Sequence, residues 1–127
     1  MNQAHKKLDV WKEGIAFASE IYKITESFPK SEIYGLTSQM RRAVVSIPSN
    51  IAEGAARFSD KEFAQFLNIS GGSLSELDTQ IEIATNLGYV TFGQKEDLEI
   101  RMTSISRKLA GLINKVRNSA KDVKGEG

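Results

Sequence analysis

The feature that most constrains the fold is a helical spacing of apolar residues that runs through four long segments of the chain. One face of the third segment would carry Phe63, Phe66, Leu67, Ser70, Leu74, Leu77, Ile81 and Ala84. The fourth segment has Leu98, Met102, Ile105, Leu109, Leu112 and Val116, and the second has Leu36, Met40, Ala43, Ile47, Ile51 and Gly54. This spacing predicts helices at about residues 9–28, 32–57, 60–87 and 92–119.

Boundary signals separate the four predicted helices. Pro29 disfavours helix at Phe28 and so ends the first one. Ser59 with Glu62, and Thr91 with Gln94, have the spacing of a capping box at a helix start. The linkers are short, which favours antiparallel neighbours. We therefore expect an all-α, up-down antiparallel four-helix bundle, with one domain at residues 1–120 and a disordered C-terminal tail at residues 121–127.

Two helix interiors contain residues that disfavour a helix. Pro48 cannot donate a backbone hydrogen bond to Val44, which costs on the order of 3 kcal/mol in a helix interior. Because the apolar spacing continues through this position, we expect a kinked but continuous helix. Gly71 and Gly72 each cost about 1 kcal/mol relative to alanine. We expect them to mark a close approach between helices.

The first predicted helix carries two apolar stripes. Leu8, Trp11, Ile15, Ala18 and Tyr22 form the first stripe, and Val10, Phe17, Ile21, Ile24 and Phe28 form the second. Surface helices usually have one such stripe, and monomers rarely expose a large apolar patch. The helix is therefore either wedged between neighbours or part of a subunit interface. We favour a homo-oligomer whose interface is the second stripe.

Composition excludes several classes of functional site. The 127 residues include no cysteine and a single histidine, His5, which excludes disulfides, zinc ribbons, thiol catalysis and sites with two imidazoles. No apolar run has the length of a membrane span, and the N-terminus lacks an apolar signal core. We expect a cytoplasmic protein with no enzymatic activity, cofactor, bound metal or membrane association.

The charges are unevenly distributed although the net charge is only +1. Residues 59–100 carry 2 Lys/Arg and 8 Asp/Glu, whereas residues 101–127 carry 7 and 2. Basic residues at helical spacing can contact nucleic-acid phosphates. The candidates are Arg41, Arg42 and Arg57 in the second helix, and Arg101, Lys108 and Lys115 in the fourth. The alternative for the fourth-helix set is pairing with Glu76, Asp78 or Glu82 of the third helix.

A polar stripe follows the second predicted helix. Its members are Gln39, Arg42, Ser46, Ser49, Asn50, Glu53 and Arg57. Three interpretations remain open: a solvated face, a structural network, or a surface that contacts a ligand such as phosphate. Within the structural motif of Pro48, Asn50, Glu53 and Gly54, we expect Asn50 and Glu53 to orient arginines or to seal a subunit contact.

Several stretches resemble one protein family. They are residues 8–11, Phe28-Pro29 and residues 34–54, of which SIPSNIAEG at residues 46–54 is the most specific. Phe63, Phe66-Leu67 and residues 72–80 and 87–89 extend the match. In these stretches the chain resembles the bacterial 23S rRNA intervening-sequence (S23) proteins. These are related to the accessory variability protein of diversity-generating retroelements. The resemblance implies a four-helix bundle that assembles into a homo-oligomeric ring, with a pentamer expected, and it brings no catalytic residues.

Together these observations predict a non-enzymatic, oligomeric helical bundle that binds RNA or another nucleic acid through its basic residues. The alternative is a protein-interaction scaffold whose arginines bind carboxylates of a protein partner. Binding of RNA that weakens as salt is added would favour the first.

Overall fold

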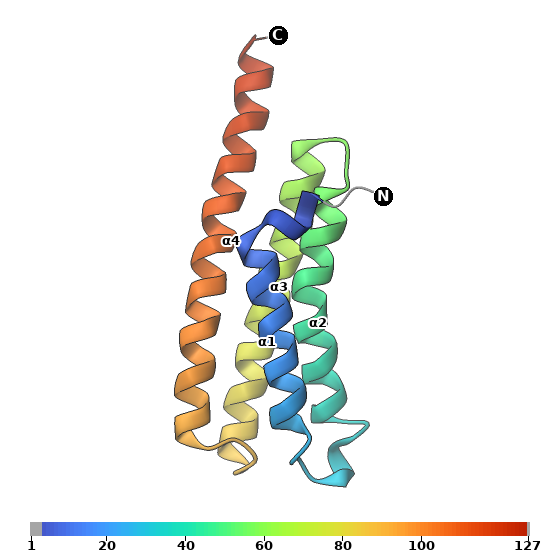
Figure 1. Cartoon of the computed structure of the whole chain (residues 1–127), viewed down its shortest axis with the longest axis vertical. Helices are drawn as coiled ribbons and strands as arrows, with labels where there is room; N and C mark the ends of the chain where they lie inside the picture. Colours follow the sequence, from blue (N-terminus) through green and yellow to red (C-terminus); the bar gives the residue numbers. More distant parts are fainter. Residues whose placement is uncertain (1–3, 127) are drawn as a thin grey trace.

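The computed structural model describes the backbone of residues 4–126 and the side chains of residues 4–120. Its four α-helices are α1 (Asp9–Thr25), α2 (Leu36–Ala55), α3 (Asp60–Asn86) and α4 (Phe92–Glu126), with short 3₁₀ helices η1 (Ala4–Lys7) and η2 (Lys30–Glu32). Successive helices run in opposite directions and lie side by side, and α4 returns to α1 (Figure 1). The described residues contain no strand. The predicted all-helical bundle is therefore confirmed, whereas the ring remains a prediction.

The helix starts follow the predicted capping signals. Ser59 Oγ accepts a hydrogen bond from the Glu62 amide at 3.2 Å at the start of α3. The box at α4 is reciprocal, because Thr91 Oγ1 accepts from the Gln94 amide at 3.1 Å and Gln94 Oε1 accepts from the Thr91 amide at 2.9 Å. These bonds satisfy backbone N–H groups that have no partner within the helix.

Three helix boundaries differ from the prediction. α1 ends at Thr25 rather than near residue 28, and α2 begins at Leu36 rather than near residue 32, because η2 and the turn to Gly35 occupy the linker. α4 continues to Glu126 rather than ending near residue 119, and its last turns extend beyond the turn between α2 and α3 (Figure 1). The side chains of residues 121–127 lie outside the described part, so the expected tail remains a prediction.

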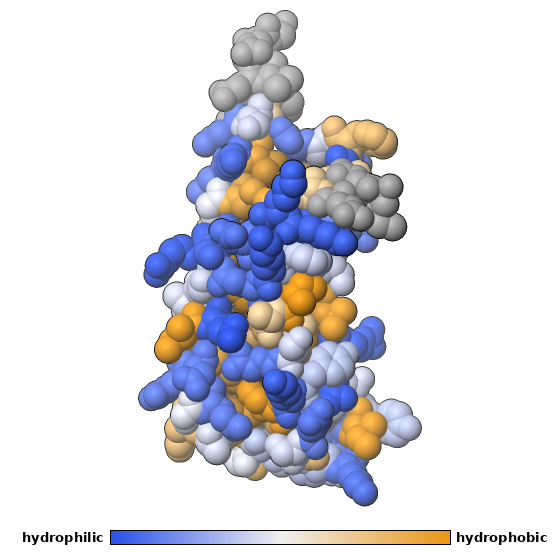
Figure 2. All heavy atoms as spheres, viewed as in Figure 1, coloured by the Kyte–Doolittle hydropathy of each residue, from blue (hydrophilic) through white to orange (hydrophobic). Residues whose placement is uncertain are grey.

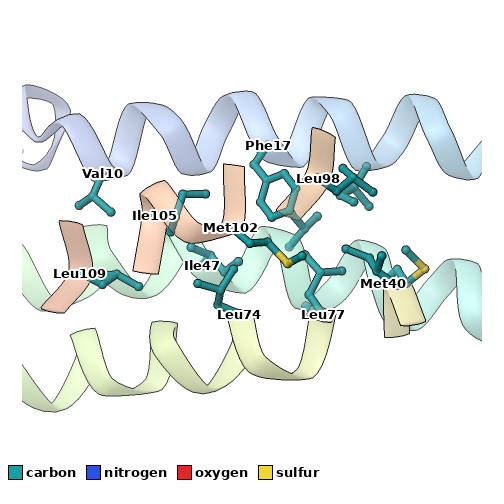
Figure 3. Close-up of a cluster of buried hydrophobic side chains, with 14 of the residues drawn as sticks. Val10, Phe17, Met40, Ile47, Leu74, Leu77, Leu98, Met102, Ile105 and Leu109 are labelled. Atoms are coloured by element: carbon teal, nitrogen blue, oxygen red, sulfur yellow. The ribbon is translucent and has the colours of Figure 1, made fainter. Parts of the chain in front are cut away.

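The core shows that the predicted interface residues of α1 were assigned wrongly. Val10, Phe17, Ile21 and Phe28 are buried in the core of their own chain, and Ile24 packs against it. Figure 3 shows Val10 and Phe17 among core side chains of the other helices. α1 packs against both α2 and α4, so it must bury one of its two stripes. The buried one is the second stripe, and the first is left partly exposed.

α2 is continuous through Pro48, as predicted. Pro48 is buried against Gly14 of α1, where an added Cβ would lie 3.2 Å from Pro48 Cβ and 3.3 Å from Pro48 Cδ. On the other side, Ser70 Oγ of α3 donates to the Ile47 carbonyl at 2.6 Å. The segment around the proline is therefore held by both neighbouring helices.

Close helix approaches occur at other glycines than those predicted. A Cβ at Gly71 or Gly72 would meet nothing within 4 Å, so the expected close approach there is wrong. Gly54 is the tight position, because an added Cβ would lie 2.7 Å from Phe66 Cβ and 2.9 Å from Phe63 Cδ1. This glycine lets the end of α2 lie directly against the start of α3.

Candidate nucleic-acid interface

The basic row of α4 faces α1. Arg101 Nε lies 2.5 Å from Glu20 Oε2, and Lys108 Nζ lies 2.7 Å from Glu13 Oε2. Between them, Ser104 Oγ donates to Glu13 Oε1 at 2.6 Å. Arg101 and Lys108 are therefore engaged within the bundle.

The alternative of pairing with the acidic third helix is wrong for these two cations. Among the described residues, an acidic residue of α3 pairs instead with the start of α4, where Glu82 Oε1 lies 2.7 Å from Lys95 Nζ. The physical reason is the rotation of α4, which turns its basic row toward α1 and away from α3.

The contact between Glu13 and Lys108 stabilises the charged form of both groups. Burial raises the pKa of Glu13, but hydrogen bonds with Lys108 and Ser104 and the nearby positive charges outweigh it and leave the pKa below its ordinary value. The hydrogen bond to Glu13 raises the pKa of Lys108, against the opposing effect of burial. The pair therefore stays ionised at neutral pH.

Arg41 is held against the end of α1. Its Nε donates to Thr25 Oγ1 at 2.9 Å, and its terminal NH2 group donates to the Tyr22 carbonyl at 3.2 Å. The guanidinium also lies 4.6 Å from the centre of the Tyr22 ring. A positive charge is favourable at the C-terminal end of a helix. The contacts of Arg41 thus join α1 to α2.

Part of the polar stripe on α2 makes contacts within the bundle, whereas the side chains of Gln39, Arg42 and Ser49 make no hydrogen bond or ion pair in the described part. Glu53 Oε1 binds Arg57 NH2 at 2.8 Å, so Glu53 orients an arginine as expected, and Arg57 also covers the Phe66 ring. Asn50 does not contact an arginine. Its Nδ2 donates to the Ser46 carbonyl at 2.8 Å and to Ser46 Oγ at 2.9 Å.

Two of the six predicted cations remain unpaired. Arg42 and Lys115 are exposed and make no hydrogen bond or ion pair with another residue of the described part. Arg42 lines two surface hollows, one between α1 and α2 and one between α2 and α3. Lys115 lies on the last turns of α4.

Further unpaired cations lie at the same end of the bundle as Lys115. The contacts Glu20–Arg101 and Glu13–Lys108 show that the start of α1 lies at the same end of the bundle as Lys115. η1 precedes α1 at this end and, within the described residues, packs against α1 and α2 and not against α4 (Figure 1). We define the basic end as Lys6, Lys7, Lys115 and Arg117, which are exposed and make no ion pair within residues 4–120. Figure 2 shows hydrophilic residues gathered over the start of α1.

Sequence reasoning did not select Lys6, Lys7 and Arg117. The available signal was the up-down topology, which places the beginning of the first helix and the last turns of the fourth at one end of the bundle.

Two negative findings concern the described residues. No group of three or more His, Cys, Asp and Glu side chains among them could hold a metal ion. No helix in this part of the chain is both long enough and apolar enough to cross a membrane.

Comparisons with known proteins agree with the fold. The model of the family described as 23S rRNA-intervening sequence protein matches residues 6–111. A solved structure from Bacteroides thetaiotaomicron, a protein of unknown function from the S23 ribosomal protein family, is similar with a TM-score of 0.73 and 26% sequence identity. The similarity covers 82% of this chain and 97% of that chain. None of the curated proteins matches this chain.

Proposed function

Because the chain belongs to the family of 23S rRNA-intervening sequence proteins, we propose that it is a non-enzymatic, cytoplasmic homo-oligomer that binds RNA. The observation that carries this proposal is the basic end, where four exposed cations have no acidic partner in the described part. Such cations bind phosphates and release counterions without reading bases. Arg42, an exposed guanidinium on the side of the bundle, lies apart from the basic end.

Oligomerisation strengthens this binding. One chain offers few phosphate contacts, and non-specific binding through few contacts is weak at physiological salt. Several copies that engage one RNA raise the overall affinity without any new kind of contact. Repetition of the basic end in a homo-oligomer therefore supplies the affinity that one bundle lacks.

We place the subunit contact on the exposed apolar face formed by α1, α2 and the linker between them. Ile15, Tyr22, Ile33 and Val45 are each between 41% and 51% exposed there. Ile15 and Tyr22 belong to the first stripe of α1, which the bundle leaves partly open. Exposed apolar surface of this kind is typical of interaction sites.

Fluorescence anisotropy with generic single-stranded RNA at several salt concentrations tests the binding site. Lys115→Ala and Arg117→Ala should each lower the affinity and reduce the log–log salt slope by about 0.7. The matched control is Lys23→Ala, which removes an exposed cation near the other end of α1. If wild-type protein does not bind RNA at low salt, the proposed function is refuted. If Lys23→Ala reduces the slope equally, the basic end is not the binding site.

Light scattering on a sizing column tests the assembly. The wild type should elute at several times 14.0 kDa, and Ile15→Glu should dissociate it without loss of helical circular dichroism. Ile83→Glu places the same charge at a similarly exposed position of α3 and should leave the size unchanged. A wild-type monomer at micromolar concentration refutes the oligomer.

A further inference from the structure

A hollow of about 380 Å³ lies in the groove between α2 and α3, which run side by side (Figure 1). α2 contributes Gln39, Arg42, Ala43 and Ser46 to its lining, and α3 contributes Ser73 and Glu76. This volume is near the lower end of the range of about 300–1,000 Å³ for small-molecule pockets. The hollow therefore suits a single small group.

Arg42 offers hydrogen-bond donors on the α2 side of the hollow, and Glu76 offers hydrogen-bond acceptors on the α3 side. Both line it, yet no ion pair within the described part of the chain joins them. The Glu76 carboxylate accepts one long hydrogen bond, from Gln80 Nε2 at 3.3 Å. By contrast, opposite charges at the α1–α4 seam meet at 2.5–2.7 Å. Both groups keep free hydrogen-bonding capacity for a ligand.

The floor of the hollow is neutral and fixed. Ser46 Oγ and Ser73 Oγ are 2.7 Å apart, and Asn50 Nδ2 donates to Ser46 Oγ at 2.9 Å. Beside Ser73, Gly72 is exposed, and an added Cβ there would meet nothing within 4 Å. Because Gly72 has no side chain, a ribose–phosphate backbone has room to approach the hollow on this side.

A ligand that fills this hollow must offer acceptors to Arg42 and donors to Glu76. A phosphate carries only acceptors and would be repelled by Glu76. Guanine has two adjacent acceptors, O6 and N7, which match the fork of an arginine. It also has two adjacent donors, N1–H and the N2 amino group, which match a carboxylate. The other three bases do not combine a pair of adjacent acceptors with a pair of adjacent donors.

We propose that this hollow binds one unpaired guanine base, with Arg42 on its O6/N7 edge and Glu76 on its N1/N2 edge. The proposal rests on the proposed function, since RNA supplies the base. Recognition of splayed-out bases by their edges is common in single-stranded RNA binding. Binding of the backbone at the basic end and of a base in the hollow would then be separate contributions.

The test compares a uridine oligomer with the same oligomer carrying one central guanosine, by fluorescence anisotropy at low salt. The wild type should prefer the guanosine oligomer by about tenfold. Replacing guanosine by inosine removes the N2 amino group, and replacing it by 7-deazaguanosine removes the N7 acceptor. Each replacement should lose most of the preference.

Glu76→Gln should remove most of the preference, leaving only the part that Arg42 contributes at O6 and N7. It should make guanosine and inosine bind equally, while affinity for the uridine oligomer stays the same or rises. Asp78→Asn is the matched control, because it removes an exposed carboxylate from α3 outside the lining of this hollow. It should keep the preference. Equal binding of the two oligomers by the wild type, or a preference that Glu76→Gln leaves undiminished, overturns this inference but leaves the proposed function intact. Absence of binding to either oligomer refutes both.

Discussion

Alanine replacement of Gly54, in the last turn of α2, and of Gly71, in the middle of α3, makes the same chemical change and should shift stability in opposite directions. Alanine is more favourable than glycine in a helix interior by about 1 kcal/mol. At Gly71 the new methyl group meets nothing within 4 Å. Gly71→Ala should therefore raise the free energy of unfolding by close to that full amount.

At Gly54 the packing cost exceeds the helix-propensity gain. The new Cβ would lie 2.7 Å from Phe66 Cβ, which is attached directly to the α3 backbone and cannot rotate away. Overpacking of this kind costs about 1–3 kcal/mol. After the propensity gain is subtracted, Gly54→Ala should lower the free energy of unfolding by about 1 kcal/mol. The two variants should then differ by about 2 kcal/mol.

The assay is urea unfolding followed by circular dichroism, with free energies extrapolated linearly to water. All variants must be compared at one protomer concentration, because association would shift the apparent stability. Gly14→Ala is an intermediate case, since its Cβ would lie 3.2 Å from the Pro48 ring. Equal stability of the Gly54 and Gly71 variants, or a more stable Gly54 variant, would refute the packing argument.

Three further predictions concern polar contacts. Ser70→Ala removes the buried bond to the Ile47 carbonyl and should cost about 1 kcal/mol in urea unfolding, whereas Ser106→Ala at an exposed position should change little. The folded-state pKa of Glu13 is lowered, so its ionised form stabilises the fold at pH values above the ordinary pKa of 4.5. This stabilisation is lost as pH falls through the folded-state pKa, so the difference in unfolding free energy between wild type and Glu13→Gln should narrow there. A difference that widens as pH falls would contradict the lowered pKa. Arg41 joins α1 to α2, so Arg41→Ala should lower the urea midpoint without changing the salt dependence of RNA binding. Arg42→Ala should leave the urea midpoint unchanged and reduce the preference for guanosine. The reverse pattern would exchange the roles of the two arginines.

Local signals in the sequence were sufficient for much of the fold. The two capping boxes determine helix starts through contacts between residues three apart, so they could be recognised without tertiary information. The continuity of α2 through Pro48 followed from an apolar spacing that did not change phase across it. By contrast, the linker before Leu36 contains a 3₁₀ turn, which helical spacing alone could not separate from the helix.

The rotation of each helix within the bundle was not predictable from periodicity. α1 has two apolar stripes of similar strength, and only its packing against α2 and α4 shows that Phe17 and Ile21 face inward. For the same reason the sequence did not indicate that Lys108 pairs with Glu13 of α1. The juxtaposition of Arg42 and Glu76 depends on the register between α2 and α3, which periodicity within each helix does not report.

The ion-paired seam between α1 and α4 has a mechanical consequence. α1 begins and α4 ends at the same end of the bundle (Figure 1). A force that pulls these two ends apart therefore stretches the contacts between α1 and α4 one after another, starting from that end. The contact Lys108–Glu13 bears the force first, and Arg101–Glu20 bears it only after the first contact has opened. Since the contacts yield in sequence and not together, α1 and α4 should separate along this seam at low force, while α4 remains packed against α3. The resistance of this seam to tension would therefore be set by single contacts.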